Sequence, residues 1–220
     1  MKIFIDTANL NEIRKAKALG LVDGATTNPT LLAKEGESAE VLIRKISAEV
    51  EGPVNVEVTG ITAEAMVEEA REMATWGNQI VIKIPIVQEG LKAVKILSSE
   101  GIRTNVTLIF SASQAILAAK AGAAYVCPFL GRLDDIGFNG LELIHQIRGI
   151  FDNYDEIETQ IVVASVRNPI HVIESGLMGA EIVTIPPSII EQMVKHPLTD
   201  KGIVQFLEDA KKIGNRKGTS

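Results

Sequence analysis

One lysine interrupts an apolar stretch of this sequence. Lys83 stands in the middle of residues 80–86, and every other residue of that stretch is apolar. Such a run predicts a strand of a parallel sheet that is covered on both faces. A lysine buried there must be paired, lose its proton or be used, because an unpaired buried charge is costly and burial makes the amine a better nucleophile near neutral pH. The alternative is a lysine at a strand end that reaches solvent along its own apolar stem.

Two carboxylates stand at the ends of other short predicted strands. Asp6 follows residues 2–5, and Glu57 lies within the alternating segment 54–58. Schiff-base chemistry needs an amine, an acid–base group that moves protons through the carbinolamine, and a second base at the bond that breaks. Lys83, Glu57 and Asp6 supply these three types of group. A purely structural ion pair is the alternative.

Amide and hydroxyl side chains gather at further strand ends. They are Asn28, Asn105, Thr107 and Ser165. Side chains of this kind suit a polyol ligand, whose hydroxyls need hydrogen-bond partners. A simple ion pair would not require them.

Two arginines are candidates for holding an anion. Arg132 lies in the predicted loop 128–138, and Arg167 precedes a helix that begins with Asn168 and Pro169. An arginine beside a helix N-terminus forms a phosphate site, because the guanidinium and the backbone N–H groups both favour negative charge. Arginines that merely lie on the surface are the alternative.

Short apolar segments alternate with longer amphipathic ones along the chain, which predicts eight strand–helix units. Strands are expected at residues 2–5, 22–26, 54–58, 80–84, 103–106, 123–127, 161–164 and 181–184, and the later helices at 88–99, 111–121, 140–151, 168–174, 187–194 and 198–212. Dividing 220 residues by eight gives about 27 residues per unit, which fits a single-domain (β/α)8 TIM barrel. A doubly wound open sheet is the rival, but the sequence lacks the Gly-x-Gly-x-x-Gly turn expected of it. The barrel with its C-terminal helix is expected over residues 1–213, and a polar tail over 214–220.

Strand alternation predicts which side chains share the barrel interior. In a parallel barrel, alternate residues point inward and the active site lies at the C-terminal ends of the strands. The predicted inward sets are Phe4 with Asp6, Thr26 with Asn28, Asn55 with Glu57, Val81 with Lys83, Asn105 with Thr107, and Val163 with Ser165 and Arg167. Thr184 ends the eighth strand. Every strand but the sixth therefore brings a polar side chain to the same end of the barrel. A pocket that holds an ionisable cluster requires this pattern, and stability alone does not.

Composition limits the compartment and the partners. The net charge of −6 and the pI near 5.2 argue against a nucleic-acid surface. No apolar stretch approaches the roughly 18 residues that span a membrane, and residues 1–10 are too polar for a signal peptide. The single cysteine, Cys127, lies in an apolar run and is expected to be a core residue in a reducing compartment. A cytoplasmic protein is expected, and its histidines show no metal-ligand spacing.

Five motifs, taken together and in order, resemble those of a known family. They are Ile5-Asp6-Thr7-Ala8, Gly24-Ala25-Thr26-Thr27-Asn28-Pro29, Val81-Ile82-Lys83-Ile84-Pro85, Thr104-Asn105-Val106-Thr107-Leu108-Ile109-Phe110-Ser111 and Ala164-Ser165-Val166-Arg167-Asn168. Over nearly its whole length the chain is similar to the small transaldolases, the group that also includes the fructose-6-phosphate aldolases. The resemblance implies a (β/α)8 barrel, sugar-phosphate substrates and no metal or organic cofactor. It also implies a homo-oligomer, a pentamer or a decamer of two stacked pentamers, with the C-terminal helix at the contacts.

The resemblance further implies a role for each candidate residue. Lys83 forms the Schiff base with the ketose donor, and Asp6 handles the proton of the donor C4 hydroxyl during C3–C4 cleavage. Glu57 works through a water in carbinolamine dehydration, and Thr107 helps to hold that water. The candidates for substrate binding are Thr26, Asn28, Asn105 and Phe129, together with Arg132, Ser165 and Arg167 as the phosphate site.

Two positions bear on whether the three-carbon unit is transferred or released. The aldolase branch that the chain resembles carries Gln in place of Glu57 and Tyr in place of Phe129. Phe129 lacks the hydroxyl that would help to activate water, so the expected activity is that of a transaldolase in the pentose phosphate pathway. The alternatives are a fructose-6-phosphate aldolase that releases free dihydroxyacetone, and a non-catalytic barrel that binds sugar phosphates.

Overall fold

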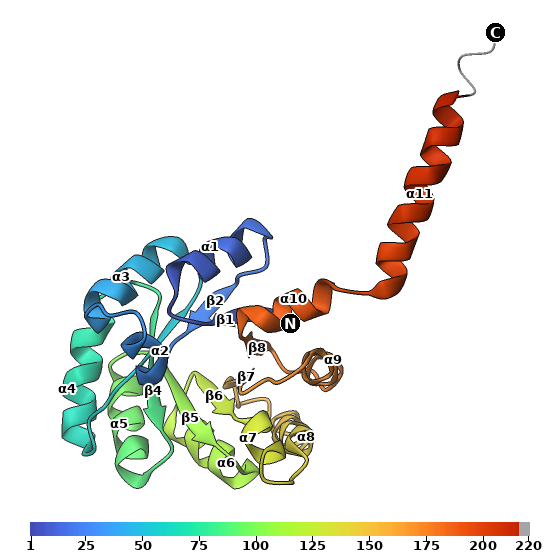
Figure 1. Ribbon diagram of the computed structural model, residues 1–220. Helices are drawn as coiled ribbons and strands as arrows, with labels where there is room; N and C mark the ends of the chain where they lie inside the picture. The colour runs from blue at the N-terminus through green and yellow to red at the C-terminus, as the bar shows by residue number, and fades with distance from the viewer. Residues whose placement is uncertain (216–220) are drawn as a thin grey trace.

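Eight short parallel strands close into a barrel in the computed structural model, which describes residues 1–215 (Figure 1). The strands are β1 (Lys2–Asp6), β2 (Gly24–Thr26), β3 (Val54–Glu57), β4 (Ile80–Pro85), β5 (Thr104–Ile109), β6 (Tyr125–Pro128), β7 (Gln160–Val163) and β8 (Ile182–Ile185). They follow one another around the barrel in chain order, and β8 pairs with β1 to close it. The predicted (β/α)8 barrel is therefore confirmed.

Helices follow the strands and cover the outside of the barrel (Figure 1). They are α1 (Leu10–Ala18), α2 (Pro29–Ala33), α3 (Ala39–Glu49), α4 (Ala63–Ala74), α5 (Gln88–Ser99), α6 (Ala112–Ala121), α7 (Leu130–Asp134), α8 (Gly140–Phe151), α9 (Pro169–Leu177), α10 (Pro187–Val194) and α11 (Pro197–Asn215). None of the helices described for this chain has the combination of length and hydropathy that a membrane crossing demands. The last helix, α11, projects away from the barrel (Figure 1).

Two hydrophobic cores explain the apolar strands. Ile80, Ile82 and Ile84 of β4 pack in the outer core, between the strands and the helices. Val81 belongs to a smaller inner core inside the barrel, which it shares with Phe4. Lys83 has the same parity as Val81, so β4 points its lysine into the barrel while its isoleucines anchor the strand to the helices. The strand pairing also sets Lys83 beside Glu57 of β3 and Asn105 of β5.

An asparagine followed by a proline opens two helices at the mouth of the barrel. The Asn28 side chain accepts a hydrogen bond from the Leu31 N–H at 2.9 Å and caps α2. Asn168 caps α9 in the same way, at 3.1 Å from the backbone nitrogen of His171. Proline suits the first helical position because it has no N–H to satisfy there. These caps lie shortly after β2 and β7, and they fix where α2 and α9 begin.

Two expectations about local structure were wrong. Residues 128–138 were expected to form a loop, but they contain the helix α7. Val163 was expected to point inward with Ser165, but it packs in the outer core, and the inner core holds Val162 instead. The strict alternation fails because Ser165 adopts a left-handed backbone conformation, with φ of 61°, and reverses the facing of the chain after β7.

The C-terminal helix is longer than expected, because α11 runs to Asn215 rather than ending at residue 212. Most of the polar tail expected over 214–220, residues 216–220, lies outside the described residues.

Candidate active site

Two adjoining pockets open at the C-terminal ends of the strands. The smaller has a volume of about 190 Å³ and the larger about 440 Å³. Both are lined by Asp6, Asn28, Lys83, Phe129 and Arg132. They therefore form one continuous site at the mouth of the barrel, where the sequence pattern placed it.

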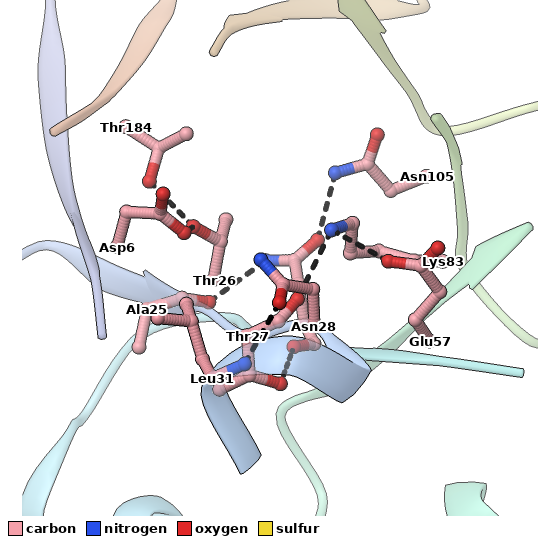
Figure 2. A network of polar contacts seen from close by, with 11 residues as sticks. Asp6, Ala25, Thr26, Thr27, Asn28, Leu31, Glu57, Lys83, Asn105 and Thr184 are labelled. Atoms are coloured by element: carbon pink, nitrogen blue, oxygen red, sulfur yellow. Dashed lines mark hydrogen bonds and ion pairs between the residues drawn. The ribbon is translucent and has the colours of Figure 1, made fainter. Parts of the chain in front are cut away.

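Lys83 is buried, with only 4% of its surface exposed, yet its amine lines the pocket. Its Nζ lies 3.0 Å from Oε2 of Glu57 and donates a hydrogen bond to the carbonyl oxygen of Thr27, also at 3.0 Å (Figure 2). The amine therefore does not reach bulk solvent along the lysine stem. It has one acid–base partner and one fixed acceptor, and it faces a space that a substrate can enter.

Asp6 comes from a different wall of the barrel from Lys83 (Figure 2). The hydroxyl of Thr26 donates to Oδ1 of Asp6 at 2.8 Å and also lies 2.6 Å from the hydroxyl of Thr184. Burial raises the pKa of Asp6, although the hydrogen bond from Thr26 and the charge of Lys83 act in the opposite direction. A carboxyl group in this setting is suited to taking up a proton and returning it.

Asn55 connects two walls of the site. Its Nδ2 donates to the Ala25 carbonyl at 3.0 Å, and its Oδ1 accepts from Nδ2 of Asn105 at 2.9 Å. The remaining oxygen of Asn105 and the hydroxyl of Thr107 are buried without a protein hydrogen-bond partner among the described residues. Unpaired buried polar atoms are costly. These two atoms therefore suit a bound water or a ligand hydroxyl.

Left-handed backbone conformations occur at two non-glycine residues of the described chain, and both line the pockets. Leu108 has a φ of 60° and Ser165 a φ of 61°. Leu108 stands where the pairing between β5 and β6 shifts in register. Such conformations cost roughly 1–3 kcal/mol and persist only where the surroundings enforce them. They turn the chain at the strand ends, and here they expose side chains that regular strands would hide.

Arg132, Ser165 and Arg167 all line the smaller pocket, and Gly131, the neighbour of Arg132, packs closely against the other two. The Arg132 guanidinium lies over the ring of Phe129, 4.9 Å from its centroid. Arg167 donates a hydrogen bond from its guanidinium to Oδ2 of Asp135 at 2.7 Å. Two cationic groups and a hydroxyl thus meet at one end of the site, which suits an anionic ligand.

Cys127 lies at the bottom of the smaller pocket and is 2% exposed. Burial raises the pKa of its thiol to about 12. A thiol in this state is a weak nucleophile, and the expectation that Cys127 is a core residue is confirmed.

Nine of the eleven candidate residues line the two pockets. They are Asp6, Thr26, Asn28, Glu57, Lys83, Phe129, Arg132, Ser165 and Arg167. Asn105 and Thr107 are fully buried on the neighbouring strand β5. The sequence pattern placed Asn55 on the face of Glu57 and Thr184 at the end of β8, but neither was taken as a candidate. The signal for Asn55 is a polar residue that stands between two valines and shares the parity of Glu57.

A (β/α)8 barrel with a buried, paired lysine in a polar pocket has the form of an enzyme that joins an amine to a carbonyl substrate. A family model described as Transaldolase/Fructose-6-phosphate aldolase matches residues 3–218. The chain belongs to this family.

Relatives from several organisms match nearly the whole chain. A protein of Caldicellulosiruptor saccharolyticus called "Probable transaldolase" is 58% identical over 97% of this chain and 98% of its own length. Proteins with the same name from Maridesulfovibrio salexigens and Methanococcus maripaludis are 57% and 56% identical. These two alignments cover 97% and 98% of this chain, and 99% and 100% of the respective relatives.

Proposed function

We propose that this protein is a transaldolase of the pentose phosphate pathway, acting in the cytoplasm. It transfers a dihydroxyacetone unit from sedoheptulose 7-phosphate or fructose 6-phosphate to glyceraldehyde 3-phosphate or erythrose 4-phosphate. The observation that carries the proposal is the amine of Lys83, held 3.0 Å from Glu57 at the wall of a polar pocket. Membership of the family and the shared name of the relatives support it.

The first half of the reaction makes an imine on Lys83. Its amine attacks the C2 carbonyl of the ketose, and the carbinolamine that forms loses its hydroxyl as water. Glu57 is placed to move the protons of this step, directly or through a water held by Thr107. Asn105 lies beside Lys83 in the strand pairing, where its unpaired amide oxygen can accept from a donor hydroxyl or the nitrogen.

The second half breaks and remakes a carbon–carbon bond. Asp6 takes the proton of the C4 hydroxyl, the C3–C4 bond breaks, and its electron pair passes into the imine to give an enamine. The aldose phosphate then leaves, and a second aldose phosphate adds to the enamine while Asp6 returns the proton. The pKa of Asp6, raised by burial, suits this double role. The steps require neither a metal nor an organic cofactor.

The phosphate group is assigned to Arg132, Ser165 and Arg167, which line one side of the smaller pocket. A phosphate entering there competes with Asp135 for the Arg167 guanidinium. Bidentate pairing of arginine with phosphate favours this exchange. Thr26 and Asn28 face the same space and are assigned to the donor end.

Phe129 supports transfer over release of free dihydroxyacetone. Its ring packs edge-on against Phe110, with ring centroids 5.9 Å apart, and the guanidinium of Arg132 covers it. It offers no hydroxyl that could help a water to protonate the enamine. The enamine therefore persists until an acceptor arrives.

The test is trapping with borohydride. Fructose 6-phosphate with borohydride is expected to leave a stable adduct on Lys83, located by mass spectrometry, and Lys83→Met is expected to leave none. Without an adduct on Lys83 the enzymatic proposal fails, and a non-catalytic sugar-phosphate-binding barrel becomes the better reading. A coupled assay without acceptor then separates the two enzymes, because steady release of dihydroxyacetone would identify an aldolase.

A homo-oligomer, a pentamer or a decamer, completes the proposal. The single barrel and its C-terminal helix, residues 1–213, form one unit of that assembly. Apolar side chains exposed along α11 support it, among them Phe206 at 76% and Leu198 at 70% exposure.

A further inference from the structure

We propose that His171 is a positioning residue for the anion end of the pocket, where it holds the backbone of Arg167 and, through Asp134, ties α9 to α7. The inference rests on the proposed function in one respect, since it takes Arg132, Ser165 and Arg167 as the phosphate site. His171 is not among the residues that line the two pockets, and the proposed chemistry gives it no role.

The contacts of His171 fix its tautomer. Its Nδ1 accepts a hydrogen bond from the backbone N–H of Arg167 at 3.3 Å, so the ring hydrogen must be on Nε2. Nε2 faces the Asp134 carboxylate, 3.2 Å from its Oδ2. The residue is buried, at 8% exposure, and burial lowers its pKa against the influence of Asp134. The neutral ring thus lies between the backbone N–H of Arg167, which donates to it, and the carboxylate of Asp134.

Both partners of the ring are themselves held. Asp134 accepts from the backbone N–H of Gly140 through its other oxygen at 2.8 Å, so the start of α8 fixes its orientation. The backbone N–H of His171 donates to the side chain of Asn168, which caps α9. The imidazole therefore links the start of α9 to the end of α7, and Asp134 extends this link to the start of α8.

The backbone that His171 holds is strained. Ser165 has a φ of 61°, two residues before Arg167, and a strained residue needs surroundings that enforce it. Close packing from α7 supplies part of that constraint. A Cβ atom at Gly131 would overlap the carbonyl oxygen of Ser165 and lie 2.8 Å from Cγ of Arg167. Arg132 follows Gly131 directly, so the two arginines of the site belong to two segments that are docked on each other.

The link through His171 matters because phosphate competes for the second link between these segments, the ion pair of Arg167 with Asp135. Arg167 and Asp135 form an ion pair whose side chains are 50% and 55% exposed. Phosphate competes with Asp135 for the Arg167 guanidinium. The contact between His171 and Asp134 does not involve that guanidinium. It remains in place and keeps the Arg167 backbone next to Ser165 while the side chain changes partner.

Matched variants distinguish the contributions of the two ring nitrogens of His171. In His171→Gln the amide nitrogen reaches toward Asp134, but the acceptor for the Arg167 N–H is lost. In His171→Asn the amide oxygen takes the place of Nδ1 and keeps that acceptor. Asp134→Asn retains an acceptor for Gly140 and loses the one for His171. His145→Gln changes an exposed histidine on α8 and serves as the control.

We expect His171→Gln to weaken binding of inorganic phosphate, measured by calorimetry, about 3- to 10-fold, the range of one net hydrogen bond. The KM for fructose 6-phosphate should rise by a similar factor while kcat stays within about twofold. Asp134→Asn should act in the same direction, His171→Asn should recover part of the loss, and His145→Gln should have no effect. Borohydride trapping with unphosphorylated dihydroxyacetone should proceed at the wild-type rate in all four variants.

Two results would overturn the inference. One is a loss of melting temperature in His171→Gln and Asp134→Asn with unchanged phosphate binding, which would make the ring purely structural. The other is an equal slowing of trapping with dihydroxyacetone and with fructose 6-phosphate. Failure of the proposed function looks different, because wild-type protein would then form no adduct with dihydroxyacetone while phosphate binding remains measurable.

Discussion

At the scale of single residues, the Lys83 amine has two acceptors of different kinds. Glu57 can take a proton, and the Thr27 carbonyl can only accept a hydrogen bond. An imine nitrogen carries fewer hydrogens than an ammonium group, so formation of the Schiff base must release at least one of these contacts. Release of Glu57 leaves a carboxylate that is free to work on the hydroxyl that departs from the carbinolamine. The pairing that keeps the buried lysine in place thus also delivers the acid–base group to the next step.

Asp6→Asn should separate stability from activity. The pKa of Asp6 is raised above its ordinary 3.8, so its contribution to stability is complete below pH 3.8 and is lost as pH rises through the raised value. Asparagine can still accept from Thr26 and carries no charge to bury. We expect the difference between the melting temperatures of the variant and of wild type to shift in favour of the variant as the pH rises from about 4 to about 8. Transfer activity should fall roughly 10²- to 10⁴-fold.

The control is Asp155→Asn, which removes an exposed carboxylate. Its melting temperature should stay parallel to that of wild type across the same pH range. If the Asp6→Asn curve is parallel as well, the carboxyl group at position 6 carries no burial penalty in the folded protein.

At the scale of elements, the short helix α7 carries the anion end of the site. It brings Arg132 to the pocket, and Asp134 and Asp135 at its end hold His171 and Arg167. It begins directly after β6, the strand from which no polar side chain was expected. At this position around the barrel, the polar side chain in the pocket therefore comes from α7 and not from β6 itself.

Gly131→Ala tests how closely α7 must approach β7. The added methyl group would overlap the Ser165 carbonyl, so α7 must move away, at about 1–3 kcal/mol. We expect a lower free energy of unfolding in urea and weaker phosphate binding. Gly149→Ala in α8 is the matched control, because a Cβ there meets nothing within 4 Å. That variant should be stabilised by roughly 0.5–1 kcal/mol, as alanine is the better helix former. Equal behaviour of the two variants would contradict close docking of α7.

The sequence pattern was sufficient to predict strands and helices that arise from a local apolar pattern, and this pattern recurs along the chain. The apolar run around Lys83 and the alternation around Glu57 specify buried strands, and eight such units specify a barrel. The pattern could not identify α7, because five residues are too few to show a helical period and Gly131 lies within them. Nor could it identify the left-handed Ser165, because part of the constraint on it comes from Gly131 in a different part of the chain. Most candidate residues were found because strand ends converge, and Phe129 came from the family resemblance. The contacts of His171, in contrast, depend on distances that no spacing encodes.

At the scale of the whole molecule, the barrel and α11 differ in how they bury apolar surface. The barrel covers its side chains with an inner and an outer core. In contrast, α11 projects from the barrel and exposes Val204, Phe206 and Leu207 at 58%, 76% and 59% (Figure 1). An amphipathic helix with an uncovered apolar side is expected to pack against another surface. The proposed homo-oligomer supplies such a surface in another copy of the chain.

Phe206→Glu should therefore dissociate the assembly. Light scattering of the unaltered 23.7 kDa chain is expected to give the mass of a pentamer or decamer, and the variant a smaller species, because a charge cannot be buried cheaply in an apolar contact. Gln205→Glu adds the same charge to the neighbouring exposed residue and should leave the mass unchanged. A monomeric wild-type chain would end the oligomer proposal, and dissociation by both variants would indicate charge repulsion rather than an apolar contact.

The inner core also contains a natural chemical probe of barrel opening. Cys127 is its single thiol, and it is buried at the bottom of the smaller pocket with a pKa near 12. A disulfide reagent too large for the pocket of about 190 Å³ can modify it only in molecules whose barrel has opened. In excess reagent, labelling is faster than reclosing, and the labelling rate then reports the rate at which the barrel opens, without any engineered probe. A sugar phosphate trapped on Lys83 should lower the labelling rate of Cys127 to the extent that the adduct keeps the barrel closed.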